Sequence, residues 1–262
     1  MEKNLSEKIK ISFGMPLQDN TRMIIGIVLS AFPLINLLIY GYFIECANRI
    51  LKKEFKLPDY NDFAKILKNA AFYLLIAIVY SIPAFTIIFI MFLKKLPFFG
   101  EFFAPFKAEL YANSPFLLAE FMSNFLGFFL TAFVLIFITW YLIISSVINY
   151  SRNYDLREAF NLRNVLKVAL NIKYFAFFLL TVLYSSALSF LSAFLLSWIP
   201  LIGNYLSSGV YLFISGVTQH ALLAFVASEI LACSEGTKHA ENKQEIKKKG
   251  LKKKNLKIWL QF

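Results

Sequence analysis

The hydrophobic and polar positions of the chain alternate in long blocks. No Asp, Glu, Lys or Arg lies in residues 69–93, 121–151 or 174–228, and a further apolar run at residues 23–47 holds a single charged residue, Glu45. An uncharged apolar run of about 18 residues or more is long enough to cross the hydrocarbon core of a bilayer. The blocks therefore predict an all-α, polytopic transmembrane helical bundle.

A proline-containing pattern, Leu-Ser-x-x-Pro-Leu-Ile, interrupts two of the apolar runs, at residues 29–35 and 196–202. Proline lacks a backbone N–H and clashes with the preceding helical turn, so it kinks or ends a helix. We therefore expect each copy to form the tip of a helical hairpin. The predicted tip residues are Pro33, Asn36, Pro200 and Gly203. A single kinked span over residues 23–47 is the alternative for the first copy.

The distribution of Lys and Arg predicts which side of the membrane each connection faces. Residues 1–22 hold four of these residues, residues 49–68 hold six, residues 150–173 hold five and residues 234–262 hold nine. The aromatic-rich connection at residues 94–115, a predicted outer loop, holds three, and residues 199–204 hold none. Because cytoplasmic segments carry an excess of Lys and Arg, we expect three hairpins of about five to six helices, with both termini in the cytoplasm. A single first span with the N-terminus outside is the alternative, since it misplaces only the charges of residues 1–22.

Two of the basic connections carry apolar residues at helical spacing, so we expect each to form an amphipathic helix on the cytoplasmic membrane surface. The first begins at Asn61 or Asp62 as N-cap and leads directly into a membrane span. The second lies in residues 151–173, where Asn153 or Asp155 can provide the N-cap. These two surface helices join the three predicted hairpins.

Composition supports the membrane assignment. Of 262 residues, 58% are hydrophobic and only 16% are charged, and the mean hydropathy is +0.61. A soluble domain carries about 25% charged residues. We therefore divide the chain into a cytoplasmic amphipathic N-terminal segment (residues 1–22), a membrane domain (residues 23–232) and a lysine-rich cytoplasmic tail (residues 233–262), and we place the protein in the cell membrane.

The net charge of +11 belongs to the connections and the tail. Because the basic residues lie between apolar runs, we predict the lipid bilayer as partner and no nucleic acid. The lysine-rich tail is expected to attract anionic lipid, with about 1 kcal/mol per basic residue near the surface. A solvated, disordered tail is the alternative. A protein partner or a homo-oligomer also fits the sequence.

Polar side chains inside the apolar runs are the candidates for function, since an unsatisfied polar group in hydrocarbon is costly. Five of them make up a candidate intramembrane polar site: Gln219, His220, Ser215, Ser189 and Asn149. With His220 as the titratable member, they fit a polar pathway or a small ligand pocket. Helix packing through small residues and hydrogen bonds is the alternative.

Sequence signatures of catalysis are missing, so we predict no catalytic, cofactor-binding or metal-ligating residues. Ser215 and His220 are five residues apart on one helix, which separates their directions by about 140°. No pair of acidic residues lies within a predicted span, and no phosphate-binding glycine loop is found. We interpret Glu45 at a span end, and Asp59 with Asp62 at a helix start, as structural.

Several short stretches, in the same order and spacing, resemble one family of archaeal and bacterial membrane proteins, domain of unknown function 4013 (DUF4013). The stretches are residues 33–42, Arg49, residues 57–63 (Leu-Pro-Asp-Tyr-Asn-Asp-Phe), residues 154–160 and residues 199–203. The resemblance covers about residues 16–232. It implies a multi-pass membrane protein and brings no activity and no functional residues with it.

Two classes of function agree with these observations. The first is a non-enzymatic integral membrane protein that acts through packing with the membrane or with a partner. The second is a small transporter or permease that uses the polar region around Gln219 and His220. The absence of visible chemistry favours the first class.

Overall fold

The computed structural model describes residues 4–33, 35–103, 115–200 and 202–259, and every regular element in these ranges is a helix. This confirms the predicted all-α class. In chain order the helices are α1 (Leu5–Gly14), the 3-10 helix η1 (Met15–Leu17), α2 (Asn20–Ala31), α3 (Leu37–Leu51), α4 (Phe63–Phe103), α6 (Pro115–Asn153), α7 (Leu156–Phe160), α8 (Leu162–Ala169), α9 (Ile172–Leu196) and α10 (Gly203–Trp259).

Within the described residues, four helices are long and apolar enough to cross a membrane. The stretches are Phe63–Lys94 in α4, Phe125–Asn153 in α6, Ile172–Leu196 in α9 and Gly203–Ala232 in α10. The helices α2 and α3, with 12 and 15 residues, are shorter than a complete span of about 20 residues. The chain thus has the helices of a membrane-embedded protein, while five to six spans paired as three hairpins stay a prediction.

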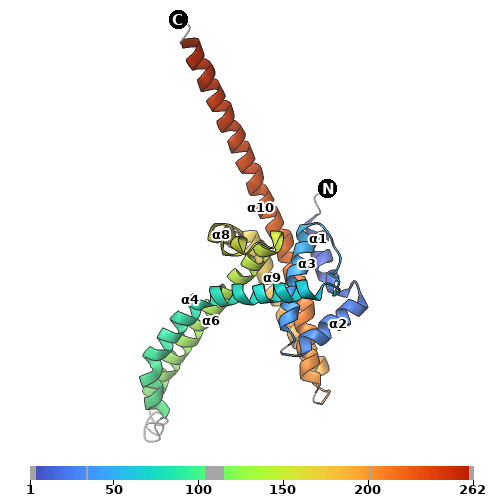
Figure 1. Ribbon diagram of the computed structural model, residues 1–262. Coiled ribbons are helices and arrows are strands. Elements are labelled where there is room, and N and C mark those ends of the chain that lie inside the picture. The colour runs from blue at the N-terminus through green and yellow to red at the C-terminus, as the bar shows by residue number, and fades with distance from the viewer. Residues whose placement is uncertain (1–3, 34, 104–114, 201, 260–262) are drawn as a thin grey trace.

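Both copies of the proline-containing pattern lie between helices. The run at residues 23–47 forms two helices, because α2 ends at Ala31 and α3 begins at Leu37. A Cβ atom at Gly203 would lie 2.1 Å from the carbonyl oxygen of Leu196, so the turn between α9 and α10 requires glycine. Both turns lie on the side of the bundle that faces away from the two termini, the turn between α9 and α10 at its tip and the turn between α2 and α3 somewhat closer to the termini (Figure 1). The predicted tip residues lie in or beside these turns: Pro33, Asn36, Pro200 and Gly203.

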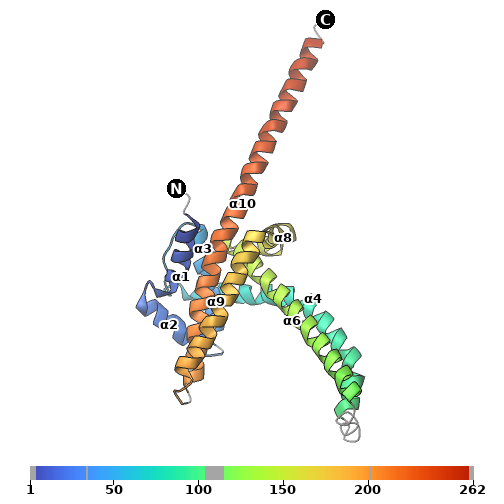
Figure 2. The same cartoon turned by 180° about the vertical axis from the view of Figure 1, so that it is seen from behind.

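The long helices form a bundle and a two-helix arm (Figures 1 and 2). In the bundle, α10 is the central helix, and α9, α2, α3 and α1 pack around its first half. Inside the chain, 78% of the most apolar stretch of α10 is buried. The corresponding share is only 11% for α4 and 11% for α6, which run side by side away from the bundle. We call residues 77–103 together with residues 115–142 the α4–α6 arm.

Two apolar clusters give the bundle its core. The central cluster joins Phe43 of α3 to Phe213 of α10, together with buried residues of α9. A smaller cluster lies at the base of the arm and joins Ile44 of α3 to Ile76 of α4 and Val147 of α6. Among the described residues, the arm packs against the bundle at its base and along the adjoining part of α6, where Phe137, Trp140 and Tyr141 contact Phe178 of α9.

The first predicted surface helix is not a separate element. Asp62 accepts a hydrogen bond from the backbone N–H of Lys65 at 3.1 Å, so the helix starts where the sequence predicts. It then continues into the apolar run without a break, because neither proline nor glycine lies between its amphipathic turns and that run, and α4 extends past Pro83 to Phe103. The helix also occupies the first part of the predicted outer loop at residues 94–115, of which residues 104–114 lie outside the described residues.

The second predicted surface helix is divided into two. The N-cap of α7 is Asp155, which accepts a hydrogen bond from the backbone N–H of Arg157 at 2.9 Å. Asn161 ends α7, and its side chain accepts from the backbone N–H of Asn164 at 3.4 Å to start α8. Asparagine side chains compete with helical backbone hydrogen bonds, which explains why one helix becomes two.

The last helix extends far beyond the bundle (Figure 1). It passes the predicted domain boundary at residue 232 without interruption and continues to Trp259, so the lysine-rich segment is helical up to that residue. The described residues of the tail therefore form a helix and not a disordered segment. The attraction of the tail to anionic lipid stays a prediction.

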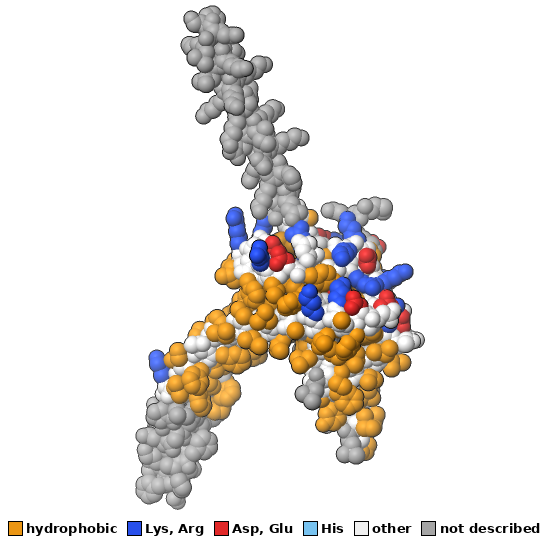
Figure 3. All heavy atoms as spheres, viewed as in Figure 1, with side chains coloured by type: hydrophobic (Ala, Val, Ile, Leu, Met, Phe, Trp, Pro, Cys, Tyr) orange, Lys and Arg blue, Asp and Glu red, His pale blue; other side chains and the backbone are white. Residues whose placement is uncertain are grey.

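Charged side chains gather at one end of the apolar body (Figure 3). In this view most Lys, Arg, Asp and Glu side chains lie near α8 and at the end from which α10 leaves the bundle, while hydrophobic side chains cover the bundle and the arm below them. Such a band is expected where a protein leaves the hydrocarbon and enters the headgroup layer.

Candidate functional site

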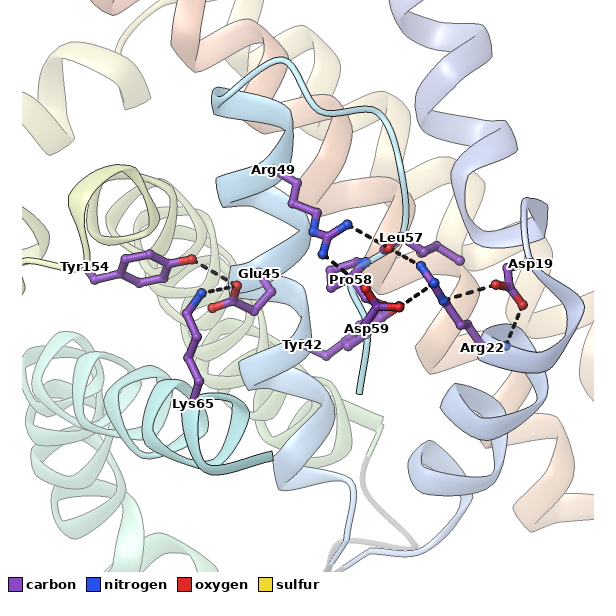
Figure 4. A network of polar contacts seen from close by, with 10 residues as sticks. All are labelled: Asp19, Arg22, Tyr42, Glu45, Arg49, Leu57, Pro58, Asp59, Lys65 and Tyr154. Atoms are coloured by element: carbon purple, nitrogen blue, oxygen red, sulfur yellow. Dashed lines mark hydrogen bonds and ion pairs between the residues drawn. The ribbon is translucent and has the colours of Figure 1, made fainter. Parts of the chain in front are cut away.

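A buried carboxylate, Glu45, lies where α3 meets α4 and the turn between α6 and α7. The residue is 8% exposed, and both of its carboxylate oxygens have partners. Asn69 of α4 donates from Nδ2 to Oε1 at 2.5 Å, and Lys65 Nζ forms an ion pair with Oε2 at 2.7 Å. The hydroxyl of Tyr154, in the turn after α6, donates to Oε2 at 3.0 Å (Figure 4). One carboxylate thus connects three segments of the chain.

Two further contacts extend this arrangement. The Tyr150 hydroxyl of α6 donates to Asn69 Oδ1 at 3.0 Å. Lys65 Nζ lies 4.6 Å from the centroid of the Tyr154 ring, which is within the range of a cation–π interaction. We call Glu45, Lys65, Asn69, Tyr150 and Tyr154 the Glu45 cluster. Because the carboxylate oxygens are occupied by donors of the same chain, the cluster is suited to holding helices together.

Tyr154 has a left-handed backbone conformation, with φ 56°. This conformation costs about 1–2 kcal/mol for a residue other than glycine. The backbone N–H of Tyr154 donates to the carbonyl oxygen of Tyr150 at 2.8 Å, and the side chain points toward Glu45 (Figure 4). Burial, and then the Glu45 carboxylate, raise the pKa of Tyr154 above its ordinary value, so its hydroxyl remains protonated as the donor.

A second polar cluster attaches the connection between α3 and α4 to α2 (Figure 4). The carboxylate of Asp59 forms ion pairs with Arg22 of α2 and with Arg49 of α3, the latter at 3.7 Å. Both arginines also donate to the carbonyl oxygen of Leu57, Arg22 at 2.5 Å and Arg49 at 3.1 Å. Asp19, the N-cap of α2, pairs with Arg22 at 3.1 Å. We call these five residues the Asp59 cluster.

Two stacked tyrosines fasten the same connection. The rings of Tyr42 and Tyr60 lie 4.6 Å apart and nearly parallel, at 12°. The Tyr42 hydroxyl donates to the carbonyl oxygen of Pro58 at 3.0 Å, and the Tyr60 hydroxyl donates to the carbonyl oxygen of Arg22 at 3.3 Å. Burial raises the pKa of Tyr60, so this hydroxyl also stays protonated. The connection is therefore held by side chains of both α2 and α3.

Two of the predicted intramembrane site residues lie next to each other in the core of α10. Gln219 donates from Nε2 to the hydroxyl oxygen of Thr181 on α9 at 3.3 Å. The His220 ring stacks on Phe43 with centroids 5.0 Å apart, and its Nδ1 lies 2.8 Å from the carbonyl oxygen of Gly216. In the described part of the chain, His220 Nε2 has no hydrogen-bond partner.

The other predicted site residues make local contacts. The Ser215 hydroxyl donates to the carbonyl oxygen of Tyr211 at 2.6 Å, and Asn149 donates from Nδ2 to the carbonyl oxygen of Ser145 at 3.1 Å. Ser189 is half-buried on α9. The hydrogen bonds thus join Gln219 to a neighbouring helix, whereas those of Ser215 and Asn149 stay within their own helices.

Two apolar pockets lie along the arm. One, of about 120 Å³, lies between α4 and α6 and is lined by residues that include Ser81, Trp140 and Ile143. The other, of about 390 Å³, lies on α4 around Phe85. Among the described residues, no three His, Cys, Asp or Glu side chains come together where a metal ion could be held. The arrangement therefore offers apolar surface on the arm and paired polar groups at its base.

Sequence reasoning alone misses both polar clusters. It places Glu45 at a span end within reach of water and Asp59 at a helix start, whereas each binds residues far away in the chain. One signal for Glu45 was present, because a carboxylate inside an apolar run requires donors from elsewhere. Nothing in the sequence identifies those donors.

Comparison with known proteins finds one family. A family model described as "Protein of unknown function (DUF4013)" matches residues 24–197, which is more than half of the chain. The matched range contains the complete Glu45 cluster and three residues of the Asp59 cluster. No curated protein and no solved structure matches the chain.

Replacing Glu45 by Ala is expected to lower the free energy of unfolding by about 2–3 kcal/mol, since its donors lose their shared acceptor. The loss is smaller than for a fully buried ion pair, because Lys65 is partly exposed and water can hydrate its ammonium group in the variant. The matched control is Glu54→Ala, an exposed carboxylate in the connection after α3, for which we expect a loss of about 1 kcal/mol or less. Unfolding in mixed detergent micelles measures both values, and equal losses would contradict the structural role of Glu45.

Glycine substitutions at Tyr154 and Lys53 should have opposite effects. Both residues have left-handed backbone conformations, with φ 56° and 65°, and glycine relieves the strain at each. Lys53 is exposed at the end of α3, so we expect Lys53→Gly to gain about 1 kcal/mol of stability. Tyr154→Gly also loses the ring and the hydrogen bond to Glu45, and we expect a net loss of about 2 kcal/mol. The same unfolding measurement is used, and a gain in both variants would argue against the contacts of Tyr154.

Proposed function

We propose a function for this chain, which belongs to the DUF4013 family. The proposed function is that of a non-enzymatic protein of the cell membrane that acts by packing against a second copy of itself. In this proposal three hairpins cross or enter the bilayer, and both termini lie in the cytoplasm. The observation that carries the proposal is an open glycine, Gly127, on α6 of the α4–α6 arm, where no atom of another helix among the described residues lies within 4 Å of the position that a Cβ atom would take.

The topology in this proposal agrees with the layout of the chain. Both proline-containing turns lie on the side of the bundle that faces away from the two termini, and most charged side chains gather at the end where the termini leave (Figures 1 and 3). The positive-inside rule assigns that end to the cytoplasm. On this assignment α2 and α3 form a short hairpin that reaches into the membrane beside the complete spans.

The base of the arm is attached to the bundle by hydrogen bonds as well as by apolar packing. The Glu45 cluster joins α3 to the start of α4 and to the end of α6, so both helices of the arm are attached to the bundle by hydrogen bonds. Ile76 and Val147 add apolar contacts at the same place. This attachment supports a role in which the direction of the arm matters.

Glycines mark the places where helices of this chain approach one another closely. A Cβ atom at Gly26, Gly41, Gly209 or Gly216 would lie within 2.5 Å of an atom of another helix. At Gly127, on the arm, no such atom lies within 4 Å. Exposed apolar side chains are adequately covered by lipid, so they do not by themselves indicate a partner. An open glycine on a membrane helix supports contact with a helix from outside this chain.

Gly127 lies on the side of α6 that faces away from α4. Ile136, nine residues later and therefore half a turn around the helix, lines the pocket between α4 and α6. Ser123 and Thr131 share the face of Gly127 at intervals of four residues. Small residues at this spacing let two membrane helices approach closely, and an identical face on a second copy gives a two-fold symmetric contact.

Cross-linking through Gly127→Cys tests this contact. With Cys233 replaced by Ser and the buried Cys46 retained, oxidation in native membranes should give a species of doubled mass. The matched control is Phe133→Cys, which is strongly exposed on α6 about 120° away from Gly127 and should not cross-link. No cross-link at Gly127, or equal cross-linking at both positions, would contradict self-association through this face.

A transporter is the second candidate, and the buried His220, whose Nε2 has no hydrogen-bond partner among the described residues, favours it. The packing proposal instead treats His220 as an aromatic core residue against Phe43, so His220→Phe should change stability by about 1 kcal/mol or less. We expect vesicles containing this variant to match the parent protein in pH-dependent solute uptake. Uptake by the parent protein that disappears in His220→Phe would favour the transporter.

A further inference from the structure

The helix α8 presents three different faces around its axis. One face is buried against the bundle and consists of Val165, Val168 and Ala169. The next face is apolar and exposed, and it consists of Leu162, Leu166 and, directly after the helix, Leu170, which are 60%, 41% and 81% exposed. The third face carries Arg163 and Lys167, both exposed. The exposed leucines therefore lie between the buried face and the cations.

The exposed leucines continue into the surface of a membrane span. Two residues after Leu170 the helix α9 begins with Ile172, which is 76% exposed, and farther along α9 Leu183 is 69% exposed. Hydrophobic side chains cover the body of the molecule below the charged band near α8 (Figure 3). The leucines of α8 thus lie at the level where α9 enters the apolar layer.

The cations of this region are not neutralised by neighbouring acids. Arg157, Arg163, Lys167 and Lys173 are exposed, and the described residues provide no ion pair to any of them. Of the two acidic residues nearby, Asp155 caps α7 and Glu158 accepts a hydrogen bond from Asn164 at 3.0 Å. The surface of α7 and α8 therefore carries an excess of positive charge.

We infer that α7 and α8 form a binding surface for anionic phospholipid, with the exposed leucines in the acyl region and Arg163 and Lys167 at the phosphate groups. A helix with an apolar strip beside basic residues lies in the interface of a bilayer in this way. Arginine also matches the geometry of a phosphate group with two parallel hydrogen bonds. This surface is separate from the lysine-rich tail and does not depend on contact with a second copy.

The observations favour lipid over other anionic partners. A free phosphate ion would use the cations and leave the leucines without a role. A protein partner would have to cover an apolar strip that already continues into the lipid-facing surface of α9. Anionic lipid satisfies both parts, because its acyl chains contact the strip and its headgroup contacts the cations.

Thermal unfolding of the purified full chain in mild detergent tests this surface. Phosphatidylglycerol, added stepwise, should raise the melting temperature at lower concentration than phosphatidylcholine does. In Arg163→Gln/Lys167→Gln the half-saturating concentration of phosphatidylglycerol should rise about 30-fold, the effect of losing two basic contacts. The matched control, Lys56→Gln/Lys94→Gln, removes the same charge away from α7 and α8 and should bind as the parent protein does.

The outcomes separate lipid binding from other causes. Equal melting temperatures of all variants in phosphatidylcholine show that folding is intact. No preference for phosphatidylglycerol, or the same loss in both double variants, would overturn the inference. Glycerol phosphate, which has the headgroup charge without acyl chains, should give no stabilisation, and stabilisation equal to that by the lipid would assign the site to a free phosphate instead.

A fluorescent label tests the position of the leucines. With Cys233 replaced by Ser, a label at Leu170→Cys in bilayers should be quenched by lipids that carry a quencher near the headgroup. A label at Asn153→Cys, exposed at the end of α6, is the comparison and should be quenched by iodide in the water. Equal quenching of both labels by iodide would overturn the placement of α8 in the interface.

Discussion

A carboxylate that leaves water must find hydrogen-bond donors, and in this protein Glu45 imposes that requirement on three segments at once. Its partners come from the first two turns of α4 and from the turn after α6. The contact therefore sets where α4 begins its path and where α6 ends. Glu45 thus helps to fix the base of the arm, together with the apolar contacts of Ile76 and Val147 and the contacts of Tyr141 of α6 with Phe178 of α9.

The sequence contains enough to predict the helices and their breaks, and too little to predict how they meet. Charge-free runs and the Pro-Leu-Ile pattern correctly place the apolar parts of the long helices and the ends of α2 and α9, whereas α4 and α10 continue beyond their runs to Phe103 and Trp259. Local signals fail where two rules compete, as at Asn161, whose side chain starts a new helix inside an apolar stripe. The clusters around Glu45 and Asp59 could not be predicted, because their members are up to 109 residues apart and only the folded chain brings them together.

The uneven burial of the helices is understandable only with lipid as the solvent. A helix such as α4, with 11% of its apolar stretch buried, would expose an aggregation-prone surface in water. In a bilayer, exposing the same surface costs little free energy, because lipid chains are as apolar as leucine side chains. Polar contacts and close glycine approaches then determine the arrangement, and both are concentrated in the bundle and at the base of the arm.

The central position of α10 has a consequence for biosynthesis. The ribosome makes this helix after α1, α2, α3 and α9, although all four pack against it. The short helices α2 and α3 are made early and must wait in the membrane or in the translocation machinery until their main neighbour arrives. Assembly of the bundle therefore cannot simply follow the order of synthesis, in contrast to domains that fold from the N-terminus as they emerge.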